Sequence, residues 1–105
     1  MVRDHPYYSL KKVKLLVQKN ILINPNARYT ASRDFGWDNK DIKKALLRLQ
    51  PKHFYKLGTR YDDPSVHVDY YKARNLIDED VYIHFRVEKD DNQEDRLIIC
   101  SFKRI

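Results

Sequence analysis

The apolar positions in the first part of the chain recur at helical spacing. One such stripe consists of Leu10, Val13, Leu16 and Val17. Because residues three and four apart share a helix face, the stripe predicts a helix over residues 10–19, which Ser9 can cap. The apolar residues 21–23 predict a short strand, followed by a turn over residues 24–26.

Two further helices follow from the same kind of pattern. Residues 28–35 predict a short helix that ends at Gly36. Asp38 can cap a third helix, and Pro51 ends it. The buried face of this third helix is expected to consist of Ile42, Ala45, Leu46 and Leu49.

The second half of the chain changes to a period of two, which is typical of strands. Four segments with β-branched and aromatic residues show it: 55–61, 67–74, 80–89 and 96–103. Polar turns separate them at residues 62–65, 75–79 and 90–95. Because no connection is long enough for a crossover helix, we expect antiparallel pairing. The pattern therefore predicts one α+β domain over residues 1–105, with about three helices, mainly from the N-terminal half, packed on one face of an antiparallel sheet.

Alternation also divides the strand side chains between two faces of the sheet. The core face is expected to carry Val81, Ile83, Phe85 and Val87, and from the last strand Ile98, Cys100 and Phe102. The other face is expected to carry Lys56, Arg60, Lys72, Arg74, Tyr82, His84, Arg86 and Lys103. Such a face is almost purely cationic, whereas solvated sheet faces usually mix charges. Cations bind phosphates and aromatic rings stack on unpaired bases, so the face favours single-stranded nucleic acid.

The charge distribution agrees with a polyanionic partner. The 105 residues include 21 Lys and Arg against 15 Asp and Glu, a formal net charge of +6. Residues 1–60 carry a net charge of +10, and residues 61–105 carry −4. A basic surface attracts a nucleic acid and speeds its encounter, although a simply solvated surface could have the same composition.

Several other chemistries lack the residues that they need. Cys100 is the single cysteine, which excludes a disulfide framework and a Cys-based zinc site and favours a reducing, cytoplasmic setting. Two glycines cannot form a glycine-rich phosphate loop, and the four histidines show no metal-ligand spacing. No segment approaches the ~18–20 apolar residues of a membrane span. We therefore expect no metal, no cofactor and no membrane partner, and His67, at a strand end, is kept as a candidate for proton transfer.

A series of short motifs in a fixed order resembles one protein family. The motifs are His53-Phe54-Tyr55-Lys56, then Thr59, Tyr61, Asp69, Tyr71 and Arg74, then Val81-Tyr82, and last Ser101-Phe102-Lys103. With the apolar positions of the first helix, they resemble the MqsR toxins over nearly the whole chain. The resemblance implies a fold similar to that of the RelE toxins and activity as a ribosome-independent endonuclease of messenger RNA. It also implies a partner antitoxin that binds zinc and has a helix-turn-helix domain.

The resemblance further implies a set of catalytic residues. Lys56, Tyr82 and Lys103 occupy the positions of the proposed active-site residues of the family. A fourth family position, a glutamine, is Val68 here, and valine can neither exchange a proton nor form a hydrogen bond. His67 or Lys72 could take its place.

These side chains suit RNA cleavage without a metal. The 2′-hydroxyl attacks the adjacent phosphate and the 5′-oxygen leaves, which requires a proton acceptor, a proton donor and stabilisation of negative charge. Lys56 is expected to act as a base or an electrostatic clamp, and Tyr82 to orient or relay a proton. Lys103, with Arg74 or Arg86, is expected to hold the phosphate. The other predicted contacts with single-stranded messenger RNA are Arg60, Lys72 and His84.

Two other classes of function remain open. One is an RNA-binding or regulatory module without catalysis. The other is a protein-interaction module whose basic half docks an acidic partner. Cleavage of RNA in the presence of a chelator would separate the first class from a nuclease. A complex that forms at low salt and survives RNase treatment would support the second class.

Overall fold

Helices occupy the first half of the chain and long strands the second half. The computed structural model describes residues 5–105. The helical elements within this range are α1 (Leu10–Lys19), α2 (Pro25–Phe35), α3 (Asn39–Leu46) and the 3-10 turn η1 (Pro51–His53). The strands within it are β1 (Ile21–Ile23), β2 (Phe54–Arg60), β3 (Asp63–Leu76), β4 (Glu79–Lys89) and β5 (Asp95–Arg104). The predicted α+β class is confirmed.

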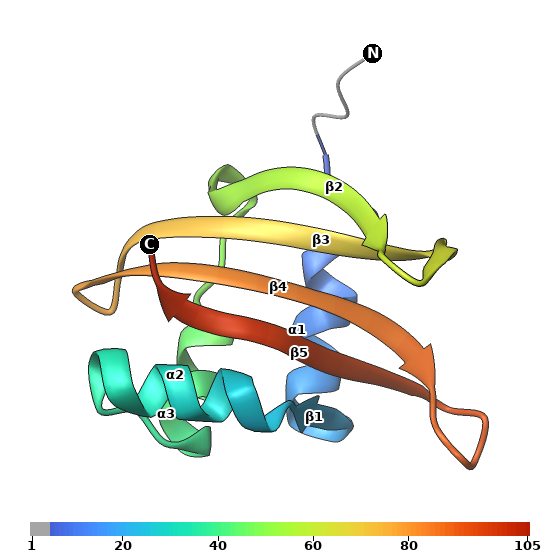
Figure 1. The fold of residues 1–105 in the computed structure, drawn as a ribbon, viewed down its shortest axis with the longest axis horizontal. Helices are drawn as coiled ribbons and strands as arrows, with labels where there is room; N and C mark the ends of the chain where they lie inside the picture. Colours follow the sequence, from blue (N-terminus) through green and yellow to red (C-terminus); the bar gives the residue numbers. More distant parts are fainter. Residues whose placement is uncertain (1–4) are drawn as a thin grey trace.

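The strands of the described residues form one five-stranded sheet in the order β1-β5-β4-β3-β2. The four long strands pair antiparallel, as the sequence predicted, whereas β1 pairs parallel with β5 and makes the sheet mixed. The helices lie on one side of the sheet, and β4 and β5 pass in front of α1 in Figure 1. The other side, here called the open face, is covered by no helix of the described residues.

The helix ends follow the capping chemistry of the sequence, with one correction. Ser9 Oγ accepts a hydrogen bond from Lys12 N at the start of α1, and Asp38 caps α3 through Asp41 N. The predicted start of the second helix at residue 28 is wrong, because α2 already begins at Pro25. Proline fits the first helical turn, where its missing N–H needs no partner.

The third helix is shorter than the sequence predicted. It ends at Leu46, and the chain then continues through a turn to η1. The predicted apolar face is nevertheless completely buried: Ile42, Ala45, Leu46 and Leu49. These side chains pack with those of α1 and with the helix-facing side chains of the sheet, so that one core lies between the two layers.

A β-bulge in β5 overturns one assignment to the core. His84 pairs with Ser101, whereas its neighbour Phe85 pairs with Ile99, so Cys100 is the extra residue. The core residues of β5 are therefore Leu97, Ile99 and Phe102. Ile98 and Cys100, predicted as core, instead lie on the open face, where Ile98 pairs with Arg86. A bulge shifts the alternation by one residue, and the sequence pattern did not show where it occurs.

A buried carboxylate holds the segment before α1 against the sheet. Asp69 of β3 is completely buried, and its two oxygens accept hydrogen bonds from the backbone N–H groups of Tyr7 and Tyr8, each 2.9 Å long. The Tyr8 hydroxyl donates to the backbone carbonyl of His67 at 2.7 Å.

The helices of the described residues are too short and too polar to cross a membrane.

Candidate active site

Two neighbouring rows of side chains cross the open face. In one row, Lys56 of β2 pairs with Tyr70 of β3, which pairs with His84 of β4, which pairs with Ser101 of β5. In the next row, Lys72 pairs with Tyr82, and Tyr82 with Lys103. Pairing across strands brings their Cβ atoms within about 5.5 Å. Residues far apart in the sequence thus converge on one surface.

Three rings form the middle of this surface, here called the aromatic patch: Tyr70, Tyr82 and His84. The rings of Tyr70 and His84 are stacked, with centroids 4.9 Å apart and planes inclined by 26°. The Tyr82 centroid lies 5.9 Å from that of His84 and 6.4 Å from that of Tyr70. The patch presents half-buried ring faces and edges of the kind on which nucleic-acid bases stack.

Three lysines, here called the site lysines, surround the aromatic patch. The Lys56 Nζ atom lies 4.8 Å from the Tyr70 ring centroid, and Lys103 Nζ lies 5.4 Å from that of Tyr82. Lys72 Nζ lies 4.0 Å from the centroid of Tyr55. None of the three forms an ion pair with a carboxylate of the described residues. Their ammonium groups therefore remain available to an anion.

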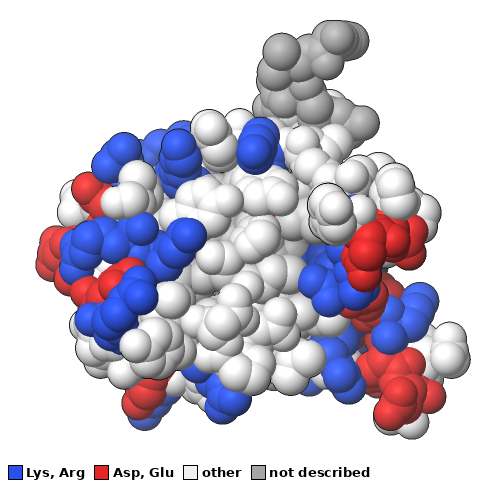
Figure 2. Space-filling model, in the orientation of Figure 1, with Lys and Arg blue, Asp and Glu red and all other residues white. Residues whose placement is uncertain are grey.

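Figure 2 shows the charges of this surface from the viewpoint of Figure 1. Uncharged atoms fill the middle, and the blue atoms of Lys and Arg lie around them. The red atoms of Asp and Glu gather toward the ends of the strands, where the hairpin turns lie. The open face is therefore an uncharged centre with cations around it.

The two protonation states of His84 are not equally favoured at this position. Burial lowers the pKa of its imidazole below the usual value, and the positive charges of Lys103, Arg86 and Lys56 lower it further. The Nδ1 atom is buried and has no hydrogen-bond partner among the described residues. At neutral pH, His84 is therefore an uncharged imidazole that can accept a proton.

The pKa of the Tyr82 hydroxyl is shifted in the opposite direction from that of His84. Burial raises the pKa of its hydroxyl, and the neighbouring Tyr70 and Tyr55 raise it further. The Tyr82 hydroxyl consequently keeps its proton at neutral pH. It can donate a hydrogen bond to an anion on the open face.

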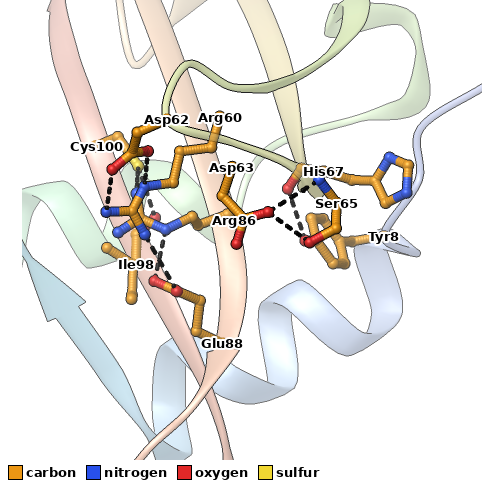
Figure 3. Close-up of polar contacts among 10 residues, drawn as sticks. All are labelled: Tyr8, Arg60, Asp62, Asp63, Ser65, His67, Arg86, Glu88, Ile98 and Cys100. Atoms are coloured by element: carbon orange, nitrogen blue, oxygen red, sulfur yellow. Dashed lines mark hydrogen bonds and ion pairs between the residues drawn. The ribbon is translucent and has the colours of Figure 1, made fainter.

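Two of the predicted cations are already engaged with carboxylates (Figure 3). Arg86 Nε donates to Glu88 at 2.6 Å, and its Nη1 lies 2.8 Å from the sulfur of Cys100. Arg60 pairs with Asp62 at 2.7 Å and with Glu88 at 3.5 Å. The expectation of an almost purely cationic face is therefore wrong, because Glu88 lies among these two arginines.

Arg74, Val68 and His67, which the sequence also singled out, lie at different places around the sheet. Arg74 is exposed and pairs with Asp80 near the β3–β4 turn, at 3.3 Å. Val68 lies on the open face but is only 4% exposed. His67 lies on the opposite side, with Asp69 and Tyr71, and its ring stacks on that of Tyr7 at 3.9 Å. The structure thus separates His67 from the aromatic patch.

Sequence reasoning missed Tyr55 as a member of this surface. Tyr55 lies beside irregular pairing, because the β2–β3 register shifts between Phe54 and Lys56. Strict alternation gives the wrong face next to a bulge. Tyr55 did belong to a motif of the sequence, but its side could not be derived from alternation.

Within residues 5–105, no three His, Cys, Asp or Glu side chains gather as a metal site would require. The chemistry that the described side chains offer is that of cations, phenols and an imidazole. Such groups can bind a phosphodiester, donate hydrogen bonds to it and accept a proton.

Fold and open face together define a small basic α+β protein that carries three lysines without ion-pair partners among the described residues on the exposed side of its sheet. The chain belongs to the MqsR toxin family: the family model described as "Motility quorum-sensing regulator, toxin of MqsA" matches residues 5–104. A similar curated protein is the mRNA interferase toxin MqsR of Escherichia coli (strain K12). It is 27% identical over 103 residues, which cover 98% of each chain. The family predicted from the motifs is confirmed.

Proposed function

We propose that this toxin is an mRNA interferase that cleaves single-stranded messenger RNA without a metal ion. The observation that supports this most is the convergence of the site lysines on the aromatic patch, with no carboxylate of the described residues paired to them. The name of the Escherichia coli relative agrees with this activity. Inhibition of translation and growth would follow from loss of messenger RNA.

The proposed reaction uses the substrate's own nucleophile. The 2′-oxygen forms a bond to the adjacent phosphorus, the bond to the 5′-oxygen breaks, and the products end in a 2′,3′-cyclic phosphate and a 5′-hydroxyl. Lys56 and Lys103 stabilise the negative charge that develops on the phosphoryl oxygens, and one of their ammonium groups gives a proton to the leaving 5′-oxygen. The Tyr82 hydroxyl between them donates a hydrogen bond to the phosphate.

The remaining side chains of the face bind and position the RNA. Lys72 extends the cationic surface beside Tyr55, which is 49% exposed and offers a ring for base stacking. Arg74 lies further along β3 and can contact a flanking phosphate. Arg60 and Arg86 act mainly through their ion pairs with Glu88, which fix one border of the surface.

The test is a cleavage assay of the purified chain with a single-stranded RNA in chelator. We expect fragments with 5′-hydroxyl ends, and a rate that falls by about 10²–10³ in Lys56→Ala and in Tyr82→Phe. Lys44→Ala is the matched control, because this exposed lysine of α3 lies on the helix side. Cleavage only after addition of Mg²⁺ would contradict metal independence. RNA that is bound but stays intact would instead support a non-catalytic module, which the apolar Val68 makes worth testing.

We also propose an antitoxin partner of the MqsA kind, as the family description implies. The resemblance of the sequence motifs implies that such a partner binds zinc and has a helix-turn-helix domain. Expression of the chain alone should stop growth, and co-expression of a neighbouring small reading frame should restore it. Growth arrest that no neighbouring frame relieves would contradict the pairing.

A further inference from the structure

His84 occupies the middle of the proposed site. It is the single imidazole that β2–β5 present on the open face, because His67 lies on the other side of β3. Its row joins it to Tyr70 and Ser101 on the neighbouring strands, and Tyr82 lies two residues before it on β4. A phosphodiester held between Lys56 and Lys103 would therefore lie over His84.

The reaction needs a group that can take a proton at neutral pH. An ammonium group or a phenol holds its own proton there, whereas an imidazole changes its state close to that pH. Burial and nearby cations keep His84 in its neutral form. Its Nδ1 atom is buried and has no hydrogen-bond partner among the described residues, so no neighbouring side chain takes up its proton-accepting capacity.

We propose that His84 is the general base, a catalytic residue that removes the proton from the attacking 2′-hydroxyl. This inference rests on the proposed function. One imidazole nitrogen takes the hydroxyl proton while the 2′-oxygen bonds to phosphorus. The bond from phosphorus to the 5′-oxygen breaks, and a site lysine protonates that oxygen. Proton exchange with water then restores both groups, so that the step needs no further reactant.

The charged groups around His84 predict a specific pH dependence of RNA cleavage. The titratable and charged side chains that face it or flank it are Lys56 of β2, Tyr70 of β3, Tyr82, Arg86 and Glu88 of β4, and Lys103 of β5. In the free protein, their net positive charge disfavours an imidazolium. A bound phosphate adds a negative charge beside the ring and favours the imidazolium. Binding of the substrate is therefore expected to raise the pKa of the His84 imidazole.

The pH dependence of the cleavage kinetics can detect this shift in the pKa of His84 directly. The acid limb of kcat/KM reports the free enzyme and that of kcat reports the complex with substrate. We expect the acid limb of kcat/KM at a lower pH than that of an ordinary histidine, and the limb of kcat at a higher pH than that of kcat/KM. The measurement uses a short single-stranded RNA over a pH series at constant ionic strength.

The variant His84→Gln keeps a polar side chain but cannot titrate. We expect kcat to fall by about 10²–10⁴ and the acid limb to disappear, with RNA affinity changed by less than about threefold. Added imidazole should partly restore the rate of His84→Ala. His67→Gln is the matched control, and we expect it to retain both the rate and the limb, because His67 lies on the helix side. Thermal unfolding of each variant checks that it is folded.

A second measurement does not depend on turnover. The His84 imidazole is titrated by NMR, with and without a 2′-methoxy RNA that cannot be cleaved, and its midpoint should rise when the RNA is added. An unchanged midpoint, or a folded His84→Gln that keeps the acid limb, would overturn the inference. If Lys56→Ala is inactive and His84→Gln is active, the inference about His84 fails while the proposed function stands. If the wild-type chain cleaves no RNA under any condition, the proposed function fails and His84 has no proton to remove.

Discussion

Gly58 leaves the space that the ring of Tyr70 occupies on the neighbouring strand. A Cβ atom at residue 58 would lie 2.8 Å from Tyr70 Cε1, closer than two such atoms can approach. The same ring stacks on His84 at 4.9 Å. A glycine at the edge of the sheet therefore contributes to the position of the proposed base.

This relationship predicts the effect of Gly58→Ala. The new methyl group should displace the Tyr70 ring, lower the rate of RNA cleavage by roughly tenfold and reduce the free energy of unfolding by about 1 kcal/mol. Cleavage kinetics and urea unfolding measure the two effects. When Gly58→Ala is added to a Tyr70→Ala variant, it should lower the cleavage rate and the stability little further, because the ring with which its methyl group would clash is absent. Equal losses in both backgrounds would show that Gly58 acts on something other than Tyr70.

The engagement of Arg60 and Arg86 with Glu88 predicts that this carboxylate restrains RNA binding. Glu88→Gln removes one negative charge from the border of the open face, so RNA should bind more tightly at low salt. The slope of log affinity against log salt should become steeper by about 0.7 for each additional phosphate that the freed arginines neutralise. Fluorescence anisotropy with a labelled RNA over a salt series measures it. Glu94→Gln, in the exposed β4–β5 loop, is the matched control, and equal slopes in the two variants would contradict the prediction.

The buried Asp69 predicts a loss of stability with little loss of chemistry. In Asp69→Asn, the amide can accept a hydrogen bond through only one atom, so one of the N–H groups of Tyr7 and Tyr8 loses its acceptor. We expect the free energy of unfolding to fall by about 1–3 kcal/mol in urea. Hydrogen exchange should increase at both amides. Because Asp69 lies on the helix side, cleavage by the folded variant should persist, and abolished cleavage would tie this carboxylate to the site.

Asp95 predicts a pH dependence of stability. Hydrogen bonds from Lys12 and Lys89 lower the pKa of its carboxyl group to about 2. A carboxylate with a lowered pKa stabilises the folded state fully above its unfolded pKa, near 4, and loses this contribution as the pH falls toward 2. Thermal unfolding over this range should therefore decline less steeply in Asp95→Asn. High salt should reduce the difference, because the side chain is partly exposed. Parallel declines at low salt would contradict the assignment.

The site was only partly predictable from alternation along the strands. Within a regularly paired stretch, such as residues 81–87, alternation assigned the faces correctly, and Tyr82 and His84 do point away from the core. It failed at Cys100, where one extra residue reverses the order of faces. It also treated charges as independent, whereas Arg86 lies within hydrogen-bond distance of Glu88 on its own strand.

The sequence by itself determined the α+β class, the capped helices, the antiparallel order of the long strands and the family, because these depend on local spacing and on residues in a fixed order. Only the tertiary structure decided that His67 lies away from Tyr82, that β1 joins the sheet parallel to β5, and that rings rather than charges occupy the middle of the open face. Those outcomes depend on strand register and on contacts between distant segments. A single bulge changes both, while local composition stays the same.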